Sequence, residues 1–286
     1  MGVFEKFIPH TLSYLESVRA FPEGAMPEAA YQKICKDYAE ANDVSVQRIT
    51  YTSDGLSITG IMAEPSGTPK GIVIYNRGGS GNYGILTVHA VMRQFVPLAR
   101  AGYLVVGSNY RGNDGSEGQD EFGGRDVEDV IALYNLMKID ATPPFIIGHS
   151  RGGMMTYLLL KKGLQARATI AIAAVSDVRG WNQTRSEMRE KIYKRFIPNF
   201  EAHEEASLAE RSAICWPEAI SCPLLLLHGT GDDRVPPTQS EDLASALELL
   251  GNPHKLMLYE GGNHALTRHW DAVMKETLEW LLKYDA

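Results

Sequence analysis

The sequence predicts an α/β fold built on one mostly parallel sheet of about eight strands, and two patterns support this prediction. From Gly71 onward, short apolar runs alternate with amphipathic stretches of helical length, which is typical of βα units with helices on both sheet faces. Before them, alternating runs at 44–52 and 56–64 flank Ser53-Asp54-Gly55, a hairpin signal. The apolar runs cover residues 71–76, 102–109, 144–148, 168–174, 223–229 and 254–260.

Two segments lie outside this alternation. Residues 1–42 have apolar positions spaced among polar ones and are predicted to form a helical extension of one or two helices. Residues 175–221 interrupt the βα order and have helical periodicity. We expect them to form a small helical cap over the strand ends, where ligands bind in open α/β sheets. A surface helix pair is the alternative. The whole chain, 1–286, is predicted to be a single domain.

The composition is that of an ordinary globular protein and argues against several kinds of partner. The formal net charge is −7 and no basic stripe occurs, which argues against nucleic acid. The longest apolar runs are strand-sized, well below the ~20 residues that span a bilayer, so no membrane partner is expected. The chain start lacks the pattern of a secretory signal.

The chain has three cysteines, Cys35, Cys215 and Cys222, without the local spacing of a zinc site. This sparse, odd set suits reduced structural thiols, although a bridge between Cys215 and Cys222 remains an alternative. We therefore expect a cytoplasmic protein without a metal or other cofactor. The sequence leaves the oligomeric state open.

The strongest chemical signal is the segment 148–153, which reads GHSRGG. It lies between an apolar strand and a helix, the context of a nucleophile elbow in the α/β-hydrolase fold. In such a turn only small residues fit at Gly148 and Gly152, and the central serine takes a strained conformation clear of the sheet. The helix directs its first N–H groups, including that of Arg151, toward a developing oxyanion. Ser150 is therefore the predicted nucleophile.

A serine nucleophile needs a base and an acid that orients the base, and in this fold both follow the serine in the order acid, then histidine. Asp232 follows the strand at 223–229, and His264 follows the strand at 254–260 and a Gly-Gly turn. We predict a Ser150–Asp232–His264 triad. Asp233 is the alternative acid and His269 the alternative base. The other two histidines beside strand ends, His149 and His228, are expected to make structural hydrogen bonds.

Together, GHSRGG, HGTGDDRVPP and EGGNH resemble the catalytic domain of the prolyl-oligopeptidase family of serine hydrolases, over residues 45–286. The resemblance implies that the acid falls on Asp232 and that the fold is that of α/β hydrolases. Dienelactone hydrolases resemble the chain less, because their nucleophile is cysteine. Larger peptidases of the family carry a β-propeller that restricts entry to short peptides. A chain of 286 residues is expected to have no room for one, so peptide specificity does not follow from the triad.

The resemblance also implies a second oxyanion donor in the loop after the strand at 71–76, at the N–H of Arg77 or Gly78. Relatives often have His-Gly-Gly or a donating tyrosine there, whereas this chain has Asn-Arg-Gly-Gly, so a main-chain donor is expected. A plain glycine-rich turn is the alternative. Tyr110, Arg111 and Trp181 are candidates for lining the substrate pocket, with a purely structural role as the alternative for Tyr110 and Arg111.

These residues predict two-step acyl transfer, in which an acyl-enzyme at Ser150 forms and is then hydrolysed. The expected substrates are small carboxylic esters, short peptides, or both. Two other functions remain open at this point. One is a non-catalytic small-ligand receptor of the same fold, and the other is an acyltransferase or lyase that uses the same triad. A probe that reacts covalently with an activated serine distinguishes a catalyst from a receptor.

Overall fold

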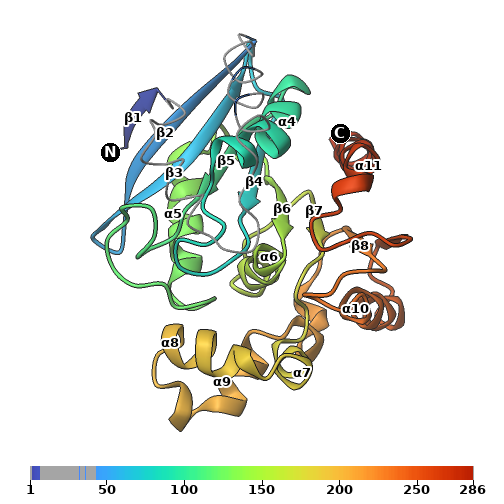
Figure 1. Cartoon of the computed structure of the whole chain (residues 1–286). Helices are drawn as coiled ribbons and strands as arrows, with labels where there is room; N and C mark the ends of the chain where they lie inside the picture. The colour runs from blue at the N-terminus through green and yellow to red at the C-terminus, as the bar shows by residue number, and fades with distance from the viewer. Residues whose placement is uncertain (1, 7–31, 33–35, 37–42, 286) are drawn as a thin grey trace.

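A computed structural model describes residues 2–6, 32, 36 and 43–285 and shows one twisted sheet at the centre of the chain (Figure 1). In this part of the chain the sheet has nine strands, in the order β1-β2-β3-β5-β4-β6-β7-β8-β9. The pairs β1–β2, β2–β3 and β3–β5 are antiparallel, and the other five pairs of neighbouring strands are parallel. The strands are β1 (Val3–Lys6), β2 (Val44–Ser53), β3 (Leu56–Pro65), β4 (Ile72–Asn76), β5 (Leu104–Ser108), β6 (Phe145–His149), β7 (Ala168–Ile172), β8 (Leu224–Gly229) and β9 (His254–Tyr259).

Strands β2 to β9 confirm the predicted fold class. The hairpin of β2 and β3 turns at Asp54 and Gly55, whose φ angles of 51° and 80° are the positive pair that a two-residue type I′ turn requires. The six parallel strands fall on the six apolar runs. Strands β4, β5, β7 and β8 are buried along their whole length, as expected for parallel strands covered on both faces.

At the beginning of the N-terminal extension the predicted helix is wrong. Val3–Lys6 form strand β1 and not a helix, and they pair antiparallel with β2. Without β1, one edge of β2 would expose backbone N–H and C=O groups without partners, and a short extended segment satisfies them. Gln32 and Lys36 are helical, and the rest of the predicted extension lies outside the described residues.

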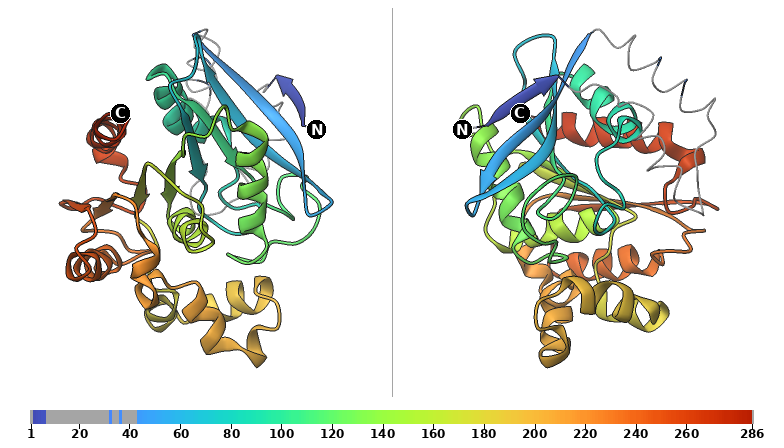
Figure 2. Two further views of the ribbon diagram at one scale, coloured as in Figure 1. Left: turned by 180° about the vertical axis from the view of Figure 1, so that it is seen from behind. Right: turned by 60° about the vertical axis from the view of Figure 1, so that its left-hand side comes forward.

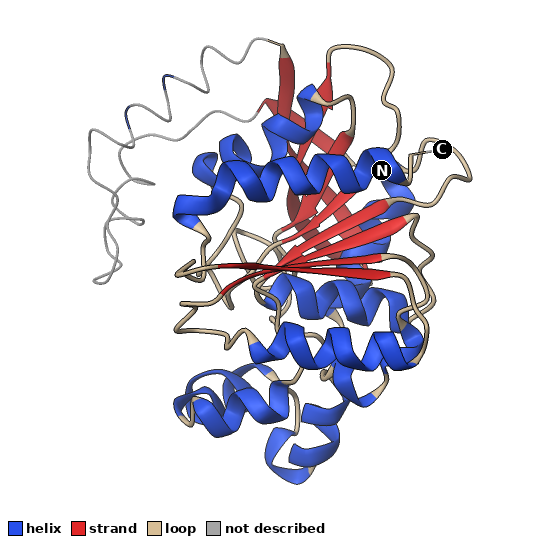
Figure 3. Ribbon diagram, turned by 90° about the vertical axis from the view of Figure 1, so that its right-hand side faces the viewer, coloured by secondary structure: helices blue, strands red, loops and turns tan. Residues whose placement is uncertain are grey.

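Helices cover both faces of the sheet, as Figure 3 shows. Helices α4 and α11 pack on one face, and α5, α6 and α10 pack on the other. In α11 the residues Val273, Thr277, Trp280 and Leu281 are buried, at the spacing of one helical face. The helices on the two faces, with the 3-10 and π turns next to them, are α3 (Val88–Ala90), η1 (Val91–Phe95), α4 (Val96–Arg100), α5 (Asp126–Met137), α6 (Arg151–Lys161), α10 (Thr238–Leu249), η6 (Thr267–His269) and α11 (Trp270–Lys283).

The segment 175–221 is helical, as predicted, and forms a group of short helices beyond α6 and α10 (Figure 2). It contacts the loops at the carboxyl ends of β4, β5 and β8, the last through the bond from Trp181 Nε1 to the carbonyl of Arg234. Phe196 lies against Gly81 after β4, and the ring of Tyr193 packs on Phe122 after β5 with centroids 5.9 Å apart. Its elements are α7 (Val178–Thr184), η2 (Arg189–Tyr193), α8 (Lys194–Phe196), η3 (Phe200–Ala202), α9 (Glu204–Glu210), η4 (Ala213–Cys215) and η5 (Pro217–Ala219).

Two further sequence expectations concern cysteines and membranes. Cys215 is exposed, Cys222 is buried, and both are free thiols, whereas Cys35 lies outside the described residues. Among the described helices, none has both the length and the apolar character needed to cross a membrane.

Candidate active site

The carboxyl ends of strands β6, β8 and β9 bring the three predicted catalytic side chains together. His264 Nε2 lies 3.0 Å from Ser150 Oγ. On the other side of the ring, His264 Nδ1 lies 2.8 Å from Asp232 Oδ2. Both are hydrogen-bond distances, so a continuous chain of hydrogen bonds joins the carboxylate to the hydroxyl. A proton leaving Ser150 Oγ has a direct acceptor in this arrangement.

Ser150 occupies a sharp turn between β6 and α6. Its φ of 57° and ψ of −122° form a strained conformation for a residue with a side chain. Its N–H donates to the carbonyl of Ile172 at 2.9 Å, which holds the strained residue in place. A side chain at Gly148 would collide with the backbone of Gly152, and one at Gly152 would collide with the backbone of Asn76. The two glycines therefore permit the close approach that the turn requires.

Four donor groups contact Asp232, two histidine rings and two main-chain N–H groups. Oδ1 accepts from the N–H groups of Arg234 and Val235, at 2.9 and 3.0 Å. Oδ2 accepts from His264, and His228 Nε2 lies 3.2 Å from the same oxygen. Burial alone would raise the pKa of Asp232, but the hydrogen bonds from His228 and His264 outweigh it and hold the pKa below its ordinary value. Asp232 is therefore an anion at neutral pH.

His228 is buried and, as predicted, makes structural hydrogen bonds. Its Nδ1 lies 2.7 Å from Ser240 Oγ and its Nε2 lies 2.9 Å from the carbonyl of Val235. Since both groups facing Nε2, this carbonyl and Asp232 Oδ2, are acceptors, Nε2 carries the proton. The contact with Asp232 is one that the sequence does not predict, because it depends on how the turn after β8 folds back.

His149 makes the other predicted structural hydrogen bond. Its Nε2 lies 3.1 Å from the carbonyl of His264, and the two rings are 5.1 Å apart between centroids. Burial and then the neighbouring His264 lower the pKa of His149 to about 3, so its ring is neutral at physiological pH. A neutral ring donates from Nε2 to that carbonyl and supports the loop that carries His264.

The loop after β4 reaches Ser150 at Gly78. A Cβ added to Gly78 would lie 3.1 Å from Ser150 Cβ, so the turn passes close to the serine. In the described part of the chain, the N–H groups of Gly78 and Arg151 donate to no protein acceptor. The carbonyl of Arg77 accepts from the hydroxyl of Tyr110 at 3.2 Å. A Cβ added to Gly152 would lie 2.9 Å from the same carbonyl oxygen of Arg77, so the predicted candidates Arg77, Gly78 and Arg151 all lie at the elbow.

The three candidates for the pocket lining are buried and bonded to protein groups. Tyr110 is fully buried. Arg111 Nη2 pairs with Asp129 at 2.7 Å and with Asp54 at 2.9 Å. Trp181 donates from Nε1 to the carbonyl of Arg234 at 2.7 Å and so holds the loop that follows Asp232. For Tyr110 and Arg111 these contacts correspond to the structural alternative.

The alternative acid and base lie away from the serine. Asp233 is exposed, and in the part of the chain that the structure describes the carboxylate partner of His264 is Asp232. His269 Nε2 contacts the carbonyl of Glu260 at 3.1 Å, and its ring packs against Tyr259. In the described residues there is also no group of three or more His, Cys, Asp or Glu side chains arranged to hold a metal ion.

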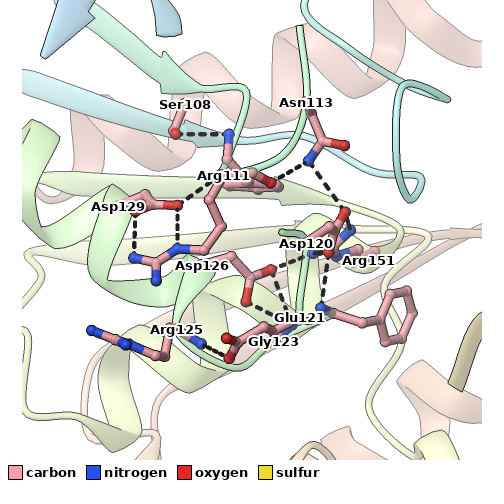
Figure 4. A network of polar contacts seen from close by, with 12 residues as sticks. Ser108, Arg111, Asn113, Asp120, Glu121, Gly123, Arg125, Asp126, Asp129 and Arg151 are labelled. Carbon is pink, nitrogen blue, oxygen red and sulfur yellow. Dashed lines mark hydrogen bonds and ion pairs between the residues drawn. The ribbon is translucent and has the colours of Figure 1, made fainter. Parts of the chain in front are cut away.

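Two acidic residues that sequence reasoning did not single out lie behind the elbow. The guanidinium of Arg151 binds both carboxylate oxygens of Asp120, at 2.8 and 2.6 Å, and also pairs with Asp126 (Figure 4). The glycine-rich composition of residues 109–124 marks an unusual loop, but nothing in the sequence indicates which acid meets Arg151. These contacts are long-range, and only the fold brings them together.

Comparison with known proteins decides the family. The profile of the prolyl oligopeptidase family matches residues 89–285, which is more than half of the chain. The chain belongs to the prolyl oligopeptidase family. This membership makes it a serine-type hydrolase of the peptidase kind, as the resemblance of its motifs implies.

The proteins that are similar to this chain include peptidases and a lipase. The uncharacterized peptidase YtmA of Bacillus subtilis is 28% identical, over 83% of this chain and 93% of its own length. The lysophosphatidylserine lipase ABHD12 of Danio rerio is 31% identical, over 69% of this chain and 53% of its own length. The solved acylaminoacyl peptidase of Pyrococcus horikoshii has a TM-score of 0.70 at 21% identity, over 86% of this chain and 42% of its own. The structural likeness supports the α/β-hydrolase fold.

Proposed function

We propose that this protein hydrolyses carboxylic esters and short-peptide amides through an acyl-enzyme formed at Ser150. The observation that carries the proposal is the chain of hydrogen bonds from Asp232 through His264 to Ser150, at 2.8 and 3.0 Å. The serine is presented by a strained elbow and faces two available N–H groups. This arrangement is the combination of nucleophile, base, orienting acid and oxyanion donors that acyl transfer needs.

In the first step, Ser150 Oγ attacks the substrate carbonyl carbon while its proton passes to His264 Nε2. The carbonyl oxygen becomes an oxyanion that accepts hydrogen bonds from the N–H groups of Arg151 and Gly78. When the tetrahedral intermediate collapses, the bond to the leaving group breaks and the imidazolium returns the proton to the leaving alcohol or amine. The acyl group is then bonded to Ser150.

In the second step, water takes the place of the leaving group. His264 removes a proton from the water, which attacks the acyl carbon, and the oxyanion forms again at the same two N–H groups. Collapse of the second intermediate breaks the bond to Ser150 Oγ and gives the proton back to it, releasing a carboxylic acid. The enzyme is regenerated with no external reactant other than water.

The anionic charge of Asp232 supports the imidazolium in both steps. Its four donor groups include no arginine or lysine side chain, so the charge is not neutralised by a permanent cation. The bond to Nδ1 also fixes the tautomer of His264, because a ring that donates from Nδ1 has its acceptor at Nε2, facing the serine. Asp232 thereby sets both the orientation and the tautomer of the imidazole.

Ester cleavage requires less of this site than amide cleavage, since an alkoxide or phenolate leaves more readily than an amine anion. The names of similar proteins include both a peptidase and a lipase, which supports testing both bond types. We propose esters as the substrates turned over fastest and short-peptide amides as the second class. The 175–221 segment, which contacts the loops around the site, is the part of the chain that would select among them.

The test compares two chromogenic substrates, a short-chain p-nitrophenyl ester and an alanine- or proline-terminated p-nitroanilide, with the wild type and Ser150→Ala. The expected result is rapid ester cleavage that depends on Ser150, together with slower cleavage of the anilide. Cleavage of the ester alone would restrict the function to a carboxylesterase. Equal ester cleavage by wild type and Ser150→Ala, with both proteins folded, would refute the proposed function.

A further inference from the structure

The side chain of Arg151 is buried among charged groups that the two-step mechanism does not use. Arg151 directly follows Ser150 and begins α6, and its side chain is 1% exposed. The carboxylate of Asp120, 2% exposed, accepts hydrogen bonds from Arg151 with both of its oxygens. Asp126 also accepts a hydrogen bond, from Nη2 of Arg151 (Figure 4). Burying three charges together is costly unless they are well paired, so this cluster calls for an explanation beyond packing.

The cluster extends to the turn that carries the second N–H donor. Arg151 Nη1 also donates to the carbonyl of Gly79, at 3.0 Å. Asp120 Oδ2 accepts from the N–H of Gly81, at 3.0 Å. The Arg151–Asp120 pair therefore holds this turn at two points, once as donor and once as acceptor. Gly79 is the neighbour of Gly78, where an added Cβ would lie 3.1 Å from Ser150 Cβ.

This turn has little conformational stability of its own. Gly79, Gly81 and Gly84 have φ angles of 73°, 57° and 84°, and glycine loses more backbone freedom on ordering than any other residue. A short glycine-rich segment without a helix or strand can hold a donor in place only if side chains from elsewhere fix it. Arg77 supplies part of that support, since its guanidinium donates to three carbonyls within residues 78–83.

We propose that Arg151, acting with Asp120, is a positioning residue that sets the separation of the two oxyanion donors. Its own main-chain N–H is one donor, and its side chain anchors the turn that presents the other, at Gly78. The main chain and the side chain of one residue thus fix both oxyanion donors relative to each other. This inference rests on the proposed function, because it assigns a geometric role within the same acyl-transfer site.

The transition state depends on this separation more than the ground state does. A substrate carbonyl oxygen is a weak acceptor, whereas the tetrahedral oxyanion needs both donors at about 2.7–3.1 Å. Loosening the Gly78 turn should therefore lower kcat and weaken the binding of a tetrahedral mimic, while KM changes little. A residue that only stabilised the fold would not produce this pattern.

The test compares two neutralised carboxylates. Asp120→Asn disturbs the pair with Arg151, and Asp129→Asn is the matched control, since Asp129 is a buried partner of Arg111 that has no contact with the Gly78 turn. We expect kcat of Asp120→Asn to fall ~10- to 100-fold, the scale of a misplaced oxyanion donor. Its inhibition constant for a trifluoromethyl ketone should rise by a similar factor. Asp129→Asn should keep both values within about threefold of wild type.

Arg151→Lys provides a second, independent variant. It keeps the main-chain N–H and the positive charge, but one ammonium cannot reproduce the planar fork that reaches Asp120, Asp126 and the Gly79 carbonyl at once. The same loss of kcat and of inhibitor affinity is expected, again with KM nearly unchanged. Circular dichroism and thermal melting establish that each variant is folded.

Several results would overturn the proposal. Wild-type kcat in folded Asp120→Asn and Arg151→Lys would do so, and so would equal losses in Asp120→Asn and Asp129→Asn. Failure of both Asp120→Asn and Arg151→Lys to fold would make Arg151 a structural residue and would also reject the positioning role. These outcomes are separate from failure of the proposed function, which would appear as activity remaining in Ser150→Ala.

Discussion

The loops after β8 and β5 both place a buried aspartate near the carboxyl edge of the sheet, but they treat its charge differently. Asp232, after β8, is bound by two histidine rings and two main-chain N–H groups. Asp120, after β5, is bound in bidentate fashion by the guanidinium of Arg151. For each, burial acts to raise the pKa but the donors prevail, and the pKa lies below its ordinary value.

In the proposed mechanism, the difference between the two loops separates a carboxylate that supports the base from one that fixes the position of loops. A carboxylate that stabilises a transient imidazolium has to keep its negative charge available, and donors other than a lysine or arginine side chain allow this. A carboxylate already paired with a permanent cation contributes little further field at the serine, but it fixes the loops it joins. Substitution of Asp232 should therefore have the larger effect on activity. Substitutions in the Arg151 cluster should lower kcat less, through the position of the Gly78 turn, and should also lower the stability of the fold.

The largest effect is expected for Asp232→Asn. Asparagine can still accept from the N–H groups of Arg234 and Val235, so the turn is retained, but the charge and the tautomer of His264 are lost. We expect kcat to fall by ~10⁴-fold near neutral pH. The melting temperature should fall below that of the wild type, because the ionised carboxylate stabilises the fold at this pH. Steady-state ester hydrolysis measures the first value, and a thermal melt measures the second.

The exposed neighbour gives the matched control for that experiment. Asp233→Asn removes the same charge one residue away and should leave kcat within about twofold of wild type, because Asp233 makes no bond to His264. If Asp233→Asn were the inactive variant and Asp232→Asn the active one, the acid would be misassigned and the comparison of the two loops would fail.

The next effect concerns stability. Arg151→Met leaves Asp120 and Asp126 buried without their cation, and we expect the free energy of unfolding to fall by ~3–5 kcal/mol, measured by urea denaturation. The double variant Arg151→Met, Asp120→Asn should recover part of this loss, since it removes one of the two unpaired charges. A loss below about 1 kcal/mol in the single variant would show that the cluster contributes little to the fold.

The smallest effect is a pH dependence of stability. Because the folded-state pKa of Asp232 lies below the ordinary value of 3.8, its ionised form stabilises the fold at higher pH, and this contribution is lost as pH falls through the folded-state pKa. The difference in unfolding free energy between wild type and Asp232→Asn should shrink as pH decreases below about 4. A difference that stayed constant or grew between about pH 6 and pH 3 would contradict the assigned direction of the pKa shift.

Much of the fold and the three central side chains could be predicted because their signals are local. The segment around Ser150 encodes strand, turn and helix in consecutive residues, and the acid and histidine each follow a strongly apolar strand. The hairpin at Asp54-Gly55 is equally local, since two residues determine the turn.

The remaining features depend on contacts between distant residues. Strand β1 forms because the edge of β2 offers backbone groups to pair with. The four residues of β1 do not by themselves indicate this pairing. The loop after β5 contains Tyr110, Asp114 and Phe122 with φ angles of 65°, 49° and 49°, values that residue preferences do not predict. That irregular path brings Asp120 to Arg151, so their pairing could not be predicted from spacing alone.

The central claim, that Ser150 is an activated nucleophile, is tested most directly by covalent labelling. Wild type and Ser150→Ala would be treated with a fluorophosphonate probe, and the modified peptide would be located by mass spectrometry. We predict stoichiometric labelling of the wild type at Ser150 and no labelling of the variant. A folded wild-type protein that remained unlabelled, or that carried the label on another residue, would contradict the proposed site.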